Sequence, residues 1–296
     1  SPVTPAAAGP RGHGTRLRPM TLVTSKQLLP VYDKPMVYYP LSTLLQAGIE
    51  DILLISSGDD IGKYEELLGD GSQIGISISY VVQEKPEGLP QAFILGEEFI
   101  GNENVTMILG DNVYFGNGMS EILSEGVKST QEGYCNLFGV SVSDPERFGV
   151  AEVSNNGRII SIEEKPIEPR SDIAVTGLYM YTNEVVDVAK NLVPSKRGEL
   201  EISELNMHYV NQGRAKLRKL GKNISWFDSG TPKSLHLASE EVMKAQTNQS
   251  EIIGCIEKAA WDMGLIDENS LQNISDQYPQ SSEYGEFLRY LMRQIS

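Results

Sequence analysis

Cysteine and histidine are both scarce in this chain, which has 2 cysteines and 3 histidines among its 296 residues. Cys135 and Cys255 lie far apart in apolar surroundings, so we expect two buried thiols in a reducing compartment rather than a disulfide. His13, His208 and His236 share no metal-binding spacing. The sequence therefore favours neither a disulfide-stapled fold nor a histidine-based metal centre.

Basic residues are in deficit, and long apolar runs are lacking. The chain has 25 Lys and Arg against 40 Asp and Glu, a net charge of −15. Such a charge disfavours nucleic acid and anionic membranes as partners, although local cations can still hold a small phosphate ligand. No apolar run is long enough to span a bilayer, and the start lacks the pattern of a signal peptide. We therefore expect a cytoplasmic protein.

Short apolar segments recur through the first half of the chain and predict β-strands. They occupy residues 51–56 (DILLIS), 76–82 (ISISYVV), 105–109 (VTMIL) and 135–142 (CNLFGVSV). Helix-like stretches separate them, such as YYPLSTLLQAG, which ends at Gly48 as a helix C-terminus commonly does. This alternation predicts a mixed, mostly parallel α/β sheet with helices on both faces.

The pattern changes in the second half. The turn Asn155-Asn156-Gly157 predicts an inserted β-hairpin, and residues 173–181 (IAVTGLYMY) predict a further strand. A helix capped by Asn183 and another that stops at Gly213 follow. Residues 233–296 have only helical spacing, so we expect a helical C-terminal segment packed on an α/β core that spans residues 1–232.

The stretch GHGTRLRPMT carries glycines that let the backbone approach a phosphate, followed by a fork-shaped cation. Gly12 and Gly14 are the glycines, Thr15 and Arg16 follow, and Lys26 lies ten residues after Arg16. The stretch matches neither the P-loop nor the dinucleotide fingerprint. By itself it is equally compatible with an exposed turn that carries solvated arginines.

Two acidic residues each follow an apolar segment. Asp111 and Asn112 follow residues 105–109, where an aspartate at the carboxyl end of a strand is well placed to hold Mg²⁺. Asp228, in WFDSGT, precedes a glycine turn and a helix start, and could share the same metal. The alternatives are a turn aspartate at position 111 and a helix-capping aspartate at position 228.

Two further polar segments are candidates for binding substrate. Glu164 and Lys165 end a predicted strand and could hold sugar hydroxyls and a phosphate, or simply be a polar strand terminus. Gln83 can donate and accept hydrogen bonds together, which suits the edge of a nucleobase, and Gly88 could let backbone approach that base. The alternative for this pair is an ordinary loop. Trp226 is expected to be a core residue.

Taken in order, these segments resemble the glucose-1-phosphate thymidylyltransferases, a family of sugar-phosphate nucleotidyltransferases. The resemblance runs from Gly12 almost to the C-terminus. Its motifs are GxGTRLxPxT, SKQLLPVYDKPMVYYPLSTL, PEGLPQAF, LGDNVYFG, DPERFGVAEV, IEEKP, AVTGLYMY, RGELEISELN and WFDSGT. Long motifs in a fixed order are far more specific than any one string.

The resemblance implies a Rossmann-like nucleotidyltransferase core with a nucleotide half at about residues 1–112 and a sugar-phosphate half at about residues 113–232. It implies that dTTP and α-D-glucose 1-phosphate give dTDP-glucose and pyrophosphate, the first step of dTDP-sugar biosynthesis of the rhamnose type. It also implies Mg²⁺ as cofactor, a homotetramer, and feedback control by a dTDP-sugar effector bound at a separate site.

Carried over residue by residue, the resemblance assigns triphosphate binding to Gly12, Gly14, Thr15, Arg16 and Lys26. It assigns thymine binding to Gln83 and Gly88, and Mg²⁺ binding to Asp111 and Asp228. Around the sugar phosphate it places Asn112, Gly149, Glu164, Lys165, Val175, Gly177 and Arg197. The residues that we expect to act in catalysis are Arg16, Lys26, Asp111 and Lys165.

The N-terminus departs from the family pattern, in which a short apolar strand runs into the glycine loop. Here Gly9, Pro10 and Arg11 precede Gly12, and His13 replaces a serine. Prolines stand where a central strand should run, and proline cannot donate to a ladder. Either the first strand is altered or residues 1–11 are not the natural start. Phe148 replaces a tyrosine of many members, which removes a hydroxyl.

Other functions fit parts of the pattern. A uridylyltransferase or another NDP-sugar pyrophosphorylase would use the same scaffold with a different base or sugar. A damaged first strand would leave a sugar-nucleotide-binding protein without turnover. A plain structural or interaction domain is a third alternative.

Overall fold

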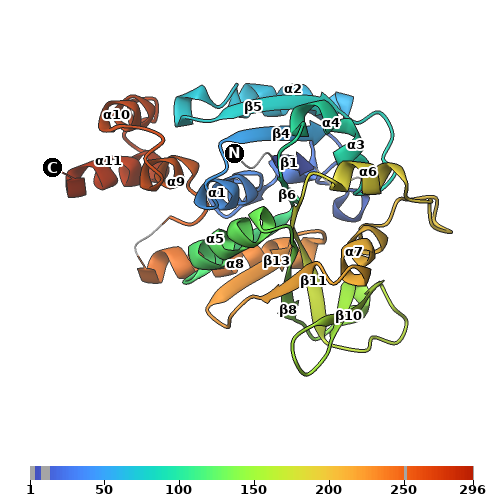
Figure 1. Cartoon of the computed structure of the whole chain (residues 1–296). Coiled ribbons are helices and arrows are strands. Elements are labelled where there is room, and N and C mark those ends of the chain that lie inside the picture. Colours follow the sequence, from blue (N-terminus) through green and yellow to red (C-terminus); the bar gives the residue numbers. More distant parts are fainter. Residues whose placement is uncertain (1–3, 8–13, 250–251, 296) are drawn as a thin grey trace.

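The computed structural model describes residues 4–7, 14–249 and 252–295 of the chain (Figure 1). Gly12, His13 and residues 9–11 lie outside the described part. Three parallel strands form the sheet nearest the N-terminus, in the order β1 (Thr4–Ala7), β4 (Asp51–Ser56) and β5 (Ser77–Val82). Helices α1 (Tyr38–Gln46) and α2 (Gly58–Leu68) connect to them, and α3 (Gln91–Leu95) and α4 (Glu97–Ile100) follow β5.

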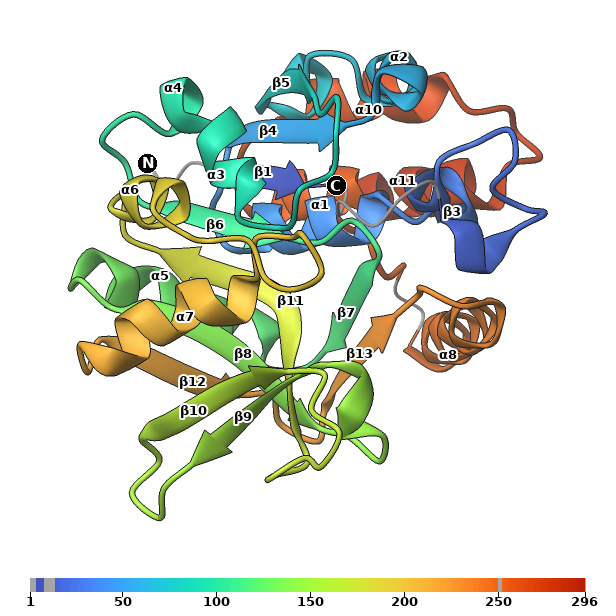
Figure 2. The ribbon, with the colours of Figure 1, turned by 90° about the vertical axis from the view of Figure 1, so that its right-hand side faces the viewer.

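The first strand does form, although it contains a proline. Thr4 pairs with Ile52 and Pro5 with Leu53 in parallel register with β4. On its other side β1 lies beside β6 (Val105–Ile108), which belongs to a different sheet (Figures 1 and 2). Proline has no N–H to give to a ladder, yet all four residues of β1 are in register with β4.

A second sheet has the order β10, β9, β11, β8, β12, with β6 also pairing β11 (Figure 2). Only β8 (Cys135–Ser141) and β12 (Ala215–Lys219) run parallel in it. The other pairs, which involve β9 (Gly149–Val153), β10 (Ile159–Glu164) and β11 (Ile173–Tyr181), are antiparallel. The sheet is therefore mixed, as expected, but the expectation that it is mostly parallel is wrong here, because the hairpin of β9 and β10 and the long strand β11 pair antiparallel. Helices α5 (Met119–Gln131), α6 (Val185–Lys190) and α7 (Ile202–Asn211) complete this region.

Strands β4 and β11 are buried on both faces, which explains why their sequences are continuously apolar. Leu178 and Met180 of β11 pack in one hydrophobic cluster with residues of α1, α2 and α5. Tyr179 and Tyr181, which alternate with them, pack in a second cluster with residues of α3, α6 and α7. Residues of β4 divide between the same two clusters, so helices cover both faces of the β-layer.

A short ribbon carries the acidic residues that the sequence singled out. It consists of β7 (Asn112–Gly116) and β13 (Ile224–Asp228), which pair antiparallel. A third hydrophobic cluster joins it to the N-terminal loops, because Val113 packs with Leu17, Met36 and Leu235. Those loops contain the 3₁₀ turns Thr15–Leu17 (η1) and Lys26–Leu28 (η2) and the small hairpin of β2 (Pro30–Val31) and β3 (Lys34–Pro35).

The C-terminal part is helical and shares the core. It contains α8 (Pro232–Gln249), α9 (Ile256–Asp262), α10 (Glu268–Asp276) and α11 (Glu283–Ile295). Leu271 and Leu288 are fully buried in the cluster that also holds Leu44 and Ile76. The approach is close at Gly75, where a Cβ would lie 2.3 Å from the carbonyl oxygen of Leu265.

A buried cation helps to fix this segment. Lys34 Nζ donates to the carbonyl of Ile253 at 2.8 Å and to Gln246 Oε1 at 3.3 Å. Burial lowers the pKa of Lys34 despite the neighbouring charge of Asp33. Burial likewise raises the pKa of the Glu257 carboxyl on α9, although Tyr284 donates a hydrogen bond to it.

Most elements that the sequence predicted are confirmed. Strands β4 and β11 have the predicted bounds, the hairpin turns at Gly157 (φ +80°), and α1 is followed by Gly48 (φ +74°). Both cysteines are free and buried. The predicted cap of α6 is wrong: the helix begins after Glu184, and no side chain of a capping residue bonds its first turn. The sequence did not predict β7 or β12, which are short and flanked by glycine or polar residues.

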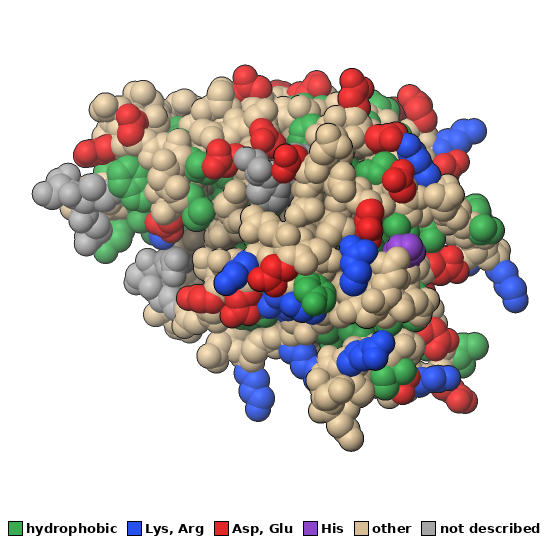
Figure 3. Space-filling model, in the orientation of Figure 1, with side chains coloured by type: hydrophobic (Ala, Val, Ile, Leu, Met, Phe, Trp, Pro, Cys, Tyr) green, Lys and Arg blue, Asp and Glu red, His purple; other side chains and the backbone are tan. Residues whose placement is uncertain are grey.

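The surface carries the acidic excess unevenly. Figure 3 shows acidic side chains along the upper edge, over α2 and β5, and both charge signs mixed lower on this face. Among the described residues, no helix has the length and apolar character needed to cross a membrane.

The shared core makes the C-terminal helices necessary for stability. Leu288→Ala on α11 should lower the free energy of unfolding by about 2–5 kcal/mol, because it leaves a cavity in the largest cluster. Glu286→Ala, on the exposed face of the same helix, should change it by less than about 0.5 kcal/mol. Denaturant unfolding of both variants checks this, and equal effects would contradict the packing described.

Candidate functional site

Asp111 and Asp228 lie side by side because β7 and β13 pair antiparallel. Asp228 ends β13 opposite Asn112, the first residue of β7. The backbone N–H of Ser229 donates to the carbonyl of Asp111 at 3.0 Å. Asp228 does not cap α8; Thr231 does, accepting from the N–H of Ser234 at 3.2 Å. The ribbon thus brings together two carboxylates that are far apart in the sequence.

Lys26 forms an ion pair with Asp111. It lies in η2, and its Nζ contacts Oδ2 of Asp111, with about one sixth of each side chain exposed (16% and 15%). Burial alone would raise the pKa of Asp111. The ammonium of Lys26, with hydrogen bonds from Lys26 and Asn112, outweighs burial and holds that pKa below its ordinary value. Asp111 is therefore kept ionised.

Arg16 approaches Asp228 across a glycine. It lies in η1, where buried Leu17 anchors the turn in the third hydrophobic cluster and Arg16 is exposed. A Cβ at Gly230 would lie 3.0 Å from Nη2 of Arg16 and 3.1 Å from Oδ1 of Asp228. Burial and the negative charge of Asp111 raise the pKa of Asp228 to about 6, against the opposing charges of Lys26 and Arg16.

The glycine loop is shaped for close packing. Gly14 has φ +56°, and a Cβ there would lie 2.9 Å from Cγ2 of Thr21. The hydroxyl of Thr21 donates to the carbonyl of Gly14 at 2.7 Å, and Thr15 is exposed beside it. This loop therefore presents Arg16 beside Asp228, with Thr15 exposed next to it in the chain.

The side chain of Asn112 connects the carboxylate of Asp111 to residues of three strands. Its Oδ1 accepts from Trp226 Nε1 at 2.6 Å, from the N–H of Gly177 at 3.0 Å and from Tyr114 Oη at 3.3 Å. Its Nδ2 donates to Oδ1 of Asp111 at 3.0 Å. A Cβ at Gly177 would lie 2.8 Å from Cγ of Asn112, so only glycine permits this contact.

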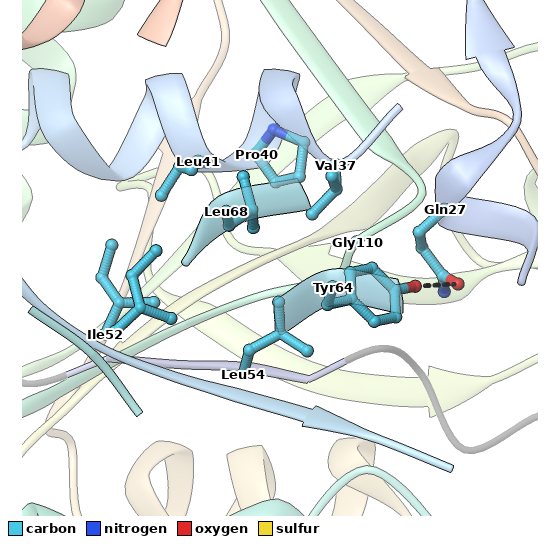
Figure 4. Close-up of a pocket in the computed structure, with 10 residues that line it drawn as sticks. Gln27, Val37, Pro40, Leu41, Ile52, Leu54, Tyr64, Leu68 and Gly110 are labelled. Atoms are coloured by element: carbon cyan, nitrogen blue, oxygen red, sulfur yellow. Dashed lines mark hydrogen bonds between the residues drawn. The ribbon is translucent and has the colours of Figure 1, made fainter. Parts of the chain in front are cut away.

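A small cavity lies behind the Asp111 turn, between α1, α2 and β4 (Figure 4). Its volume is about 20 Å³, and its lining is apolar except at Gln27, Tyr64 and the backbone of Gly110. Gln27 Oε1 accepts from Ser25 Oγ at 2.6 Å and from Tyr64 Oη at 3.3 Å. These bonds hold the turn that carries Lys26 from its buried side.

A second group of predicted residues lies at the ends of β9 and β10. Gly149 pairs with both Glu164 and Val175, and Val175 is buried. Glu164 accepts from Ser203 Oγ at 3.0 Å and pairs with Lys165 Nζ at 3.2 Å. Lys165 has φ +47°, an uncommon conformation for a residue with a side chain.

Arg197 is held beside this group by an acidic partner. Its Nε donates to Glu201 Oε1 at 3.0 Å, and its Nη2 pairs with Glu201 Oε2 at 2.5 Å. Hydrogen bonding to Glu201 raises the pKa of Arg197. Nη2 also lies 4.0 Å from Oε1 of Glu164. Arg197 thus faces the Glu164 and Lys165 side chains from another loop.

Gln83 and Gly88 form a third group, beyond the carboxyl end of β5. The N–H of Gln83 donates to the carbonyl of Ser56 at 2.8 Å, and its Nε2 donates to Gln91 Oε1 at 2.6 Å. Gly88 has φ +112° and bridges to Leu200, whose carbonyl oxygen would lie 2.0 Å from a Cβ at position 88. Residue 88 must therefore be glycine, because the backbone of Leu200 occupies the space that a side chain would need.

The sequence missed several residues that hold the predicted ones. Glu201 and Ser203 bind Arg197 and Glu164, and Gln91 binds Gln83. Trp226 is only partly buried against the core, and its indole N–H bonds Asn112, so an assignment to the core alone is incomplete. Gln91 and Glu201 lie within the motifs PEGLPQAF and RGELEISELN, which was the only available signal.

Comparison with known proteins identifies the family. The model of the nucleotidyl transferase family matches residues 9–245. A glucose-1-phosphate thymidylyltransferase of Neisseria meningitidis serogroup A is 49% identical over 95% of this chain and 97% of its own length. The chain belongs to the nucleotidyl transferase family. The resemblance to glucose-1-phosphate thymidylyltransferases expected from the motifs is thereby confirmed.

Other similar proteins support the same family assignment. A glucose-1-phosphate thymidylyltransferase of Mycolicibacterium smegmatis is 44% identical over 95% of this chain and 96% of its own length. A crystal structure of a Bacillus anthracis protein assigned as a glucose-1-phosphate thymidylyltransferase, in complex with sucrose, aligns with a TM-score of 0.74 and 40% identity. The alignment covers 81% of this chain and 95% of the Bacillus anthracis chain. The expected Rossmann-like nucleotidyltransferase fold is confirmed.

The raised pKa of Asp228 in this nucleotidyl transferase gives a pH-dependent prediction. The pKa of Asp228 in the folded state is about 6, above the ordinary 3.8. Ionisation of Asp228 therefore lowers the free energy of unfolding as the pH rises from about 4, and this destabilisation is complete above about pH 6. In EDTA, Asp228→Asn should raise the melting temperature at about pH 8 and have little effect near pH 4. Calorimetry at both pH values checks this. An equal shift at both would contradict the origin of the effect in ionisation.

Proposed function

We propose that this nucleotidyl transferase joins dTTP and α-D-glucose 1-phosphate to give dTDP-glucose and pyrophosphate. The observation that carries the proposal is the convergence of Arg16, Lys26, Asp111 and Asp228, from four separate segments, beside the glycine loop. The names of the relatives that match nearly the full chain support the choice of both substrates.

The donor set at Asp111 and Asp228 fits Mg²⁺. The two carboxylates are neighbours, and Lys26 keeps Asp111 ionised, the form in which a hard cation binds. Among the described residues, no three His, Cys, Asp or Glu side chains are placed so that they could hold a metal ion together. Mg²⁺ suits such a sparse site because it is usually held by one or two carboxylates together with water and substrate phosphates. When held by Asp111 and Asp228, it would offset the negative charge of the substrate phosphates.

The reaction needs charge neutralisation more than proton transfer. An oxygen of glucose 1-phosphate attacks the α-phosphorus of dTTP, the bond from that phosphorus to the oxygen bridging to the β-phosphate breaks, and pyrophosphate leaves with the electron pair. The attacking phosphate is already largely a dianion at neutral pH, since its second pKa is about 6. We assign Arg16 and Lys26 to the negative charge that develops on the triphosphate, with Thr15, Gly14 and Gly12 along the loop.

The Glu164 group supplies the second substrate's site in this proposal. Lys165 and Arg197 would hold the sugar phosphate, and Glu164 would accept from sugar hydroxyls. Asn112, Gly149, Val175 and Gly177 would line the pocket. The bonds that Asn112 makes to Asp111 and to β11 support a role for it in joining this half, about residues 113–232, to the nucleotide half, about residues 1–112. Gln83 and Gly88 would meet the thymine.

We also propose a cytoplasmic homotetramer that responds to a dTDP-sugar effector, as the family resemblance implies. Two free buried thiols suit a reducing compartment. Leu237 and Met243 of α8, with Tyr32 of the adjacent hairpin, are each about 40% exposed (40%, 41% and 41%) and support an interface between subunits. The helical segment of residues 233–296 would then serve assembly as well as the core.

The direct test of the proposed function is release of pyrophosphate by the purified protein with dTTP, glucose 1-phosphate and Mg²⁺. We expect saturable release that EDTA abolishes. Replacement of dTTP by UTP in the same assay measures whether the chain is a thymidylyl- or a uridylyltransferase. Absence of pyrophosphate with every nucleotide and sugar phosphate tried would overturn the assignment as an active transferase.

Removal of one charged group from the centre should slow turnover without unfolding the protein. Asp111→Asn or Arg16→Ala should lower kcat by roughly 10²-fold or more, because each removes a charge that stabilises the transition state. Asp262→Asn on α9, a partly exposed carboxylate paired with Lys258, is the matched control and should leave kcat unchanged. Near-normal kcat in Asp111→Asn would count against the site.

Lys26 should act mainly on the nucleotide. Lys26→Ala should raise KM for dTTP and lower kcat, because it removes a cation from the triphosphate side of the site while Asp111 keeps its bond from Asn112. Steady-state kinetics at saturating glucose 1-phosphate measure both constants. Unchanged values of KM and kcat would contradict the placement of Lys26.

A further inference from the structure

We propose that Gln91 is a positioning residue that fixes the carboxamide of Gln83 in one orientation and thereby selects a base that carries a proton at N3. This inference rests on the proposed function, in which Gln83 meets the base of the nucleotide. It adds a residue outside the base-contacting pair and a physical reason for the selection.

The orientation of Gln91 itself is set by Glu87, which offers one donor and one acceptor. The backbone N–H of Glu87 points at Oε1 of Gln91 at 3.0 Å, and an N–H requires an acceptor. The carboxylate oxygen Oε2 of Glu87 lies 3.0 Å from Nε2 of Gln91, and an ionised carboxylate can only accept. Rotation of the Gln91 amide by 180° would break both bonds, so its orientation is fixed.

Gln91 then fixes Gln83. Because Oε1 of Gln91 faces Gln83 at 2.6 Å, the atom that meets it must be the donor Nε2. A flipped Gln83 would bring two carbonyl oxygens together. No described residue donates to Oε1 of Gln83, so this oxygen and one N–H of Nε2 remain to meet a ligand.

The frame for these bonds is rigid. The carbonyl of Glu87 accepts from the N–H of Leu200 at 2.7 Å, and the contact of Gly88 with Leu200 leaves no space for a side chain. Gln91 is the first residue of α3, and its N–H donates to the carbonyl of Gly88 at 3.3 Å. Gln83 is tied to β4 through the carbonyl of Ser56. Each residue of the chain Glu87–Gln91–Gln83 is therefore held by backbone as well as side chain.

The fixed orientation distinguishes bases by the proton at N3. Thymine and uracil carry an N3–H donor next to an O4 acceptor, which complement the oxygen and the remaining N–H of Gln83. Cytosine has an acceptor at N3 and an amino group at C4, so it would place acceptor against acceptor and donor against donor. A mismatched pair of this kind costs about 1–3 kcal/mol, or roughly 5- to 150-fold in selectivity. If Gln83 were free to flip, the penalty would disappear.

The test compares kcat/KM for dTTP, dUTP and dCTP in three proteins: wild type, Gln91→Met and the exchange Glu87→Gln with Gln91→Glu. Methionine has the length of glutamine but cannot hold Gln83. We expect Gln91→Met to lower the preference for dTTP over dCTP roughly tenfold, mainly through a lower KM for dCTP, because a Gln83 that is free to flip no longer opposes cytosine. The ratio of dTTP to dUTP should not change, because both bases carry N3–H.

The exchanged pair is the matched control. Its carboxylate at position 91 would accept from Gln83 and from the backbone N–H at position 87, and its carboxamide at position 87 would donate to that carboxylate. The preference for dTTP over dCTP should therefore return to the wild-type level. If Gln91 had a merely structural role, Gln91→Met would lower kcat/KM for all three nucleotides by the same factor. Unchanged discrimination there, in a folded protein, would overturn the inference, and Gln91→Ala repeats the comparison if Gln91→Met does not fold.

The proposed function can fail separately. If the wild type releases no pyrophosphate, the same variants are compared by the rise in melting temperature that dTTP and dCTP produce. A dTTP preference in wild type that is reduced in Gln91→Met supports the role of Gln91 without turnover. If dTTP and dCTP raise the melting temperature of the wild type equally, the proposed role of Gln91 is overturned.

Discussion

Two carboxylates placed side by side at one end of a β-ribbon are the constraint on which this site depends. Asp111 and Asp228 repel each other, and burial together with the negative charge of Asp111 raises the pKa of Asp228. Cations must therefore surround them, and the fold supplies these from elements remote in sequence. Lys26 comes from one turn and Arg16 from another. Leu17 anchors the Arg16 turn in the third hydrophobic cluster, and Leu28 of the Lys26 turn packs against the first. A protein with a net charge of −15 thus gathers positive charge locally, where phosphates would bind.

Close approach of backbone segments is the second requirement, and glycine meets it at each junction. Gly177 makes room for Asn112, and Gly230 lies between Arg16 and Asp228. A Cβ at Gly110 would lie 2.8 Å from Cγ of Gln27, so the Asp111 turn can rest on Gln27 only because residue 110 has no side chain. These glycines do not serve flexibility. They let polar side chains approach neighbouring segments more closely than a methyl group would allow.

The sequence was most informative where one signal determined one element. The apolar runs of β4 and β11 gave the correct bounds because strands buried on both faces have no competing pattern. The partners of polar side chains could not be predicted. Nothing in WFDSGT indicates that Trp226 donates to Asn112, since that bond depends on the antiparallel register of β7 and β13. The predicted cap at Asn183 is wrong for a different reason, because α6 begins one residue later, after Glu184, whose side chain makes no capping bond.

The groups assigned to the base and to the sugar phosphate meet at one backbone contact. Gly88 bridges to Leu200, and Glu87 accepts from the N–H of Leu200, while Glu201, the next residue, holds Arg197 by two bonds. Glu87 also holds Gln91, so one short segment orients Gln83 on one side and adjoins the support of Arg197 on the other. A side chain at position 88 would have to displace Leu200, and both ends of this connection would move with it. The glycine to which the family resemblance assigns thymine binding is therefore required first by the protein itself, for its contact with the backbone of Leu200.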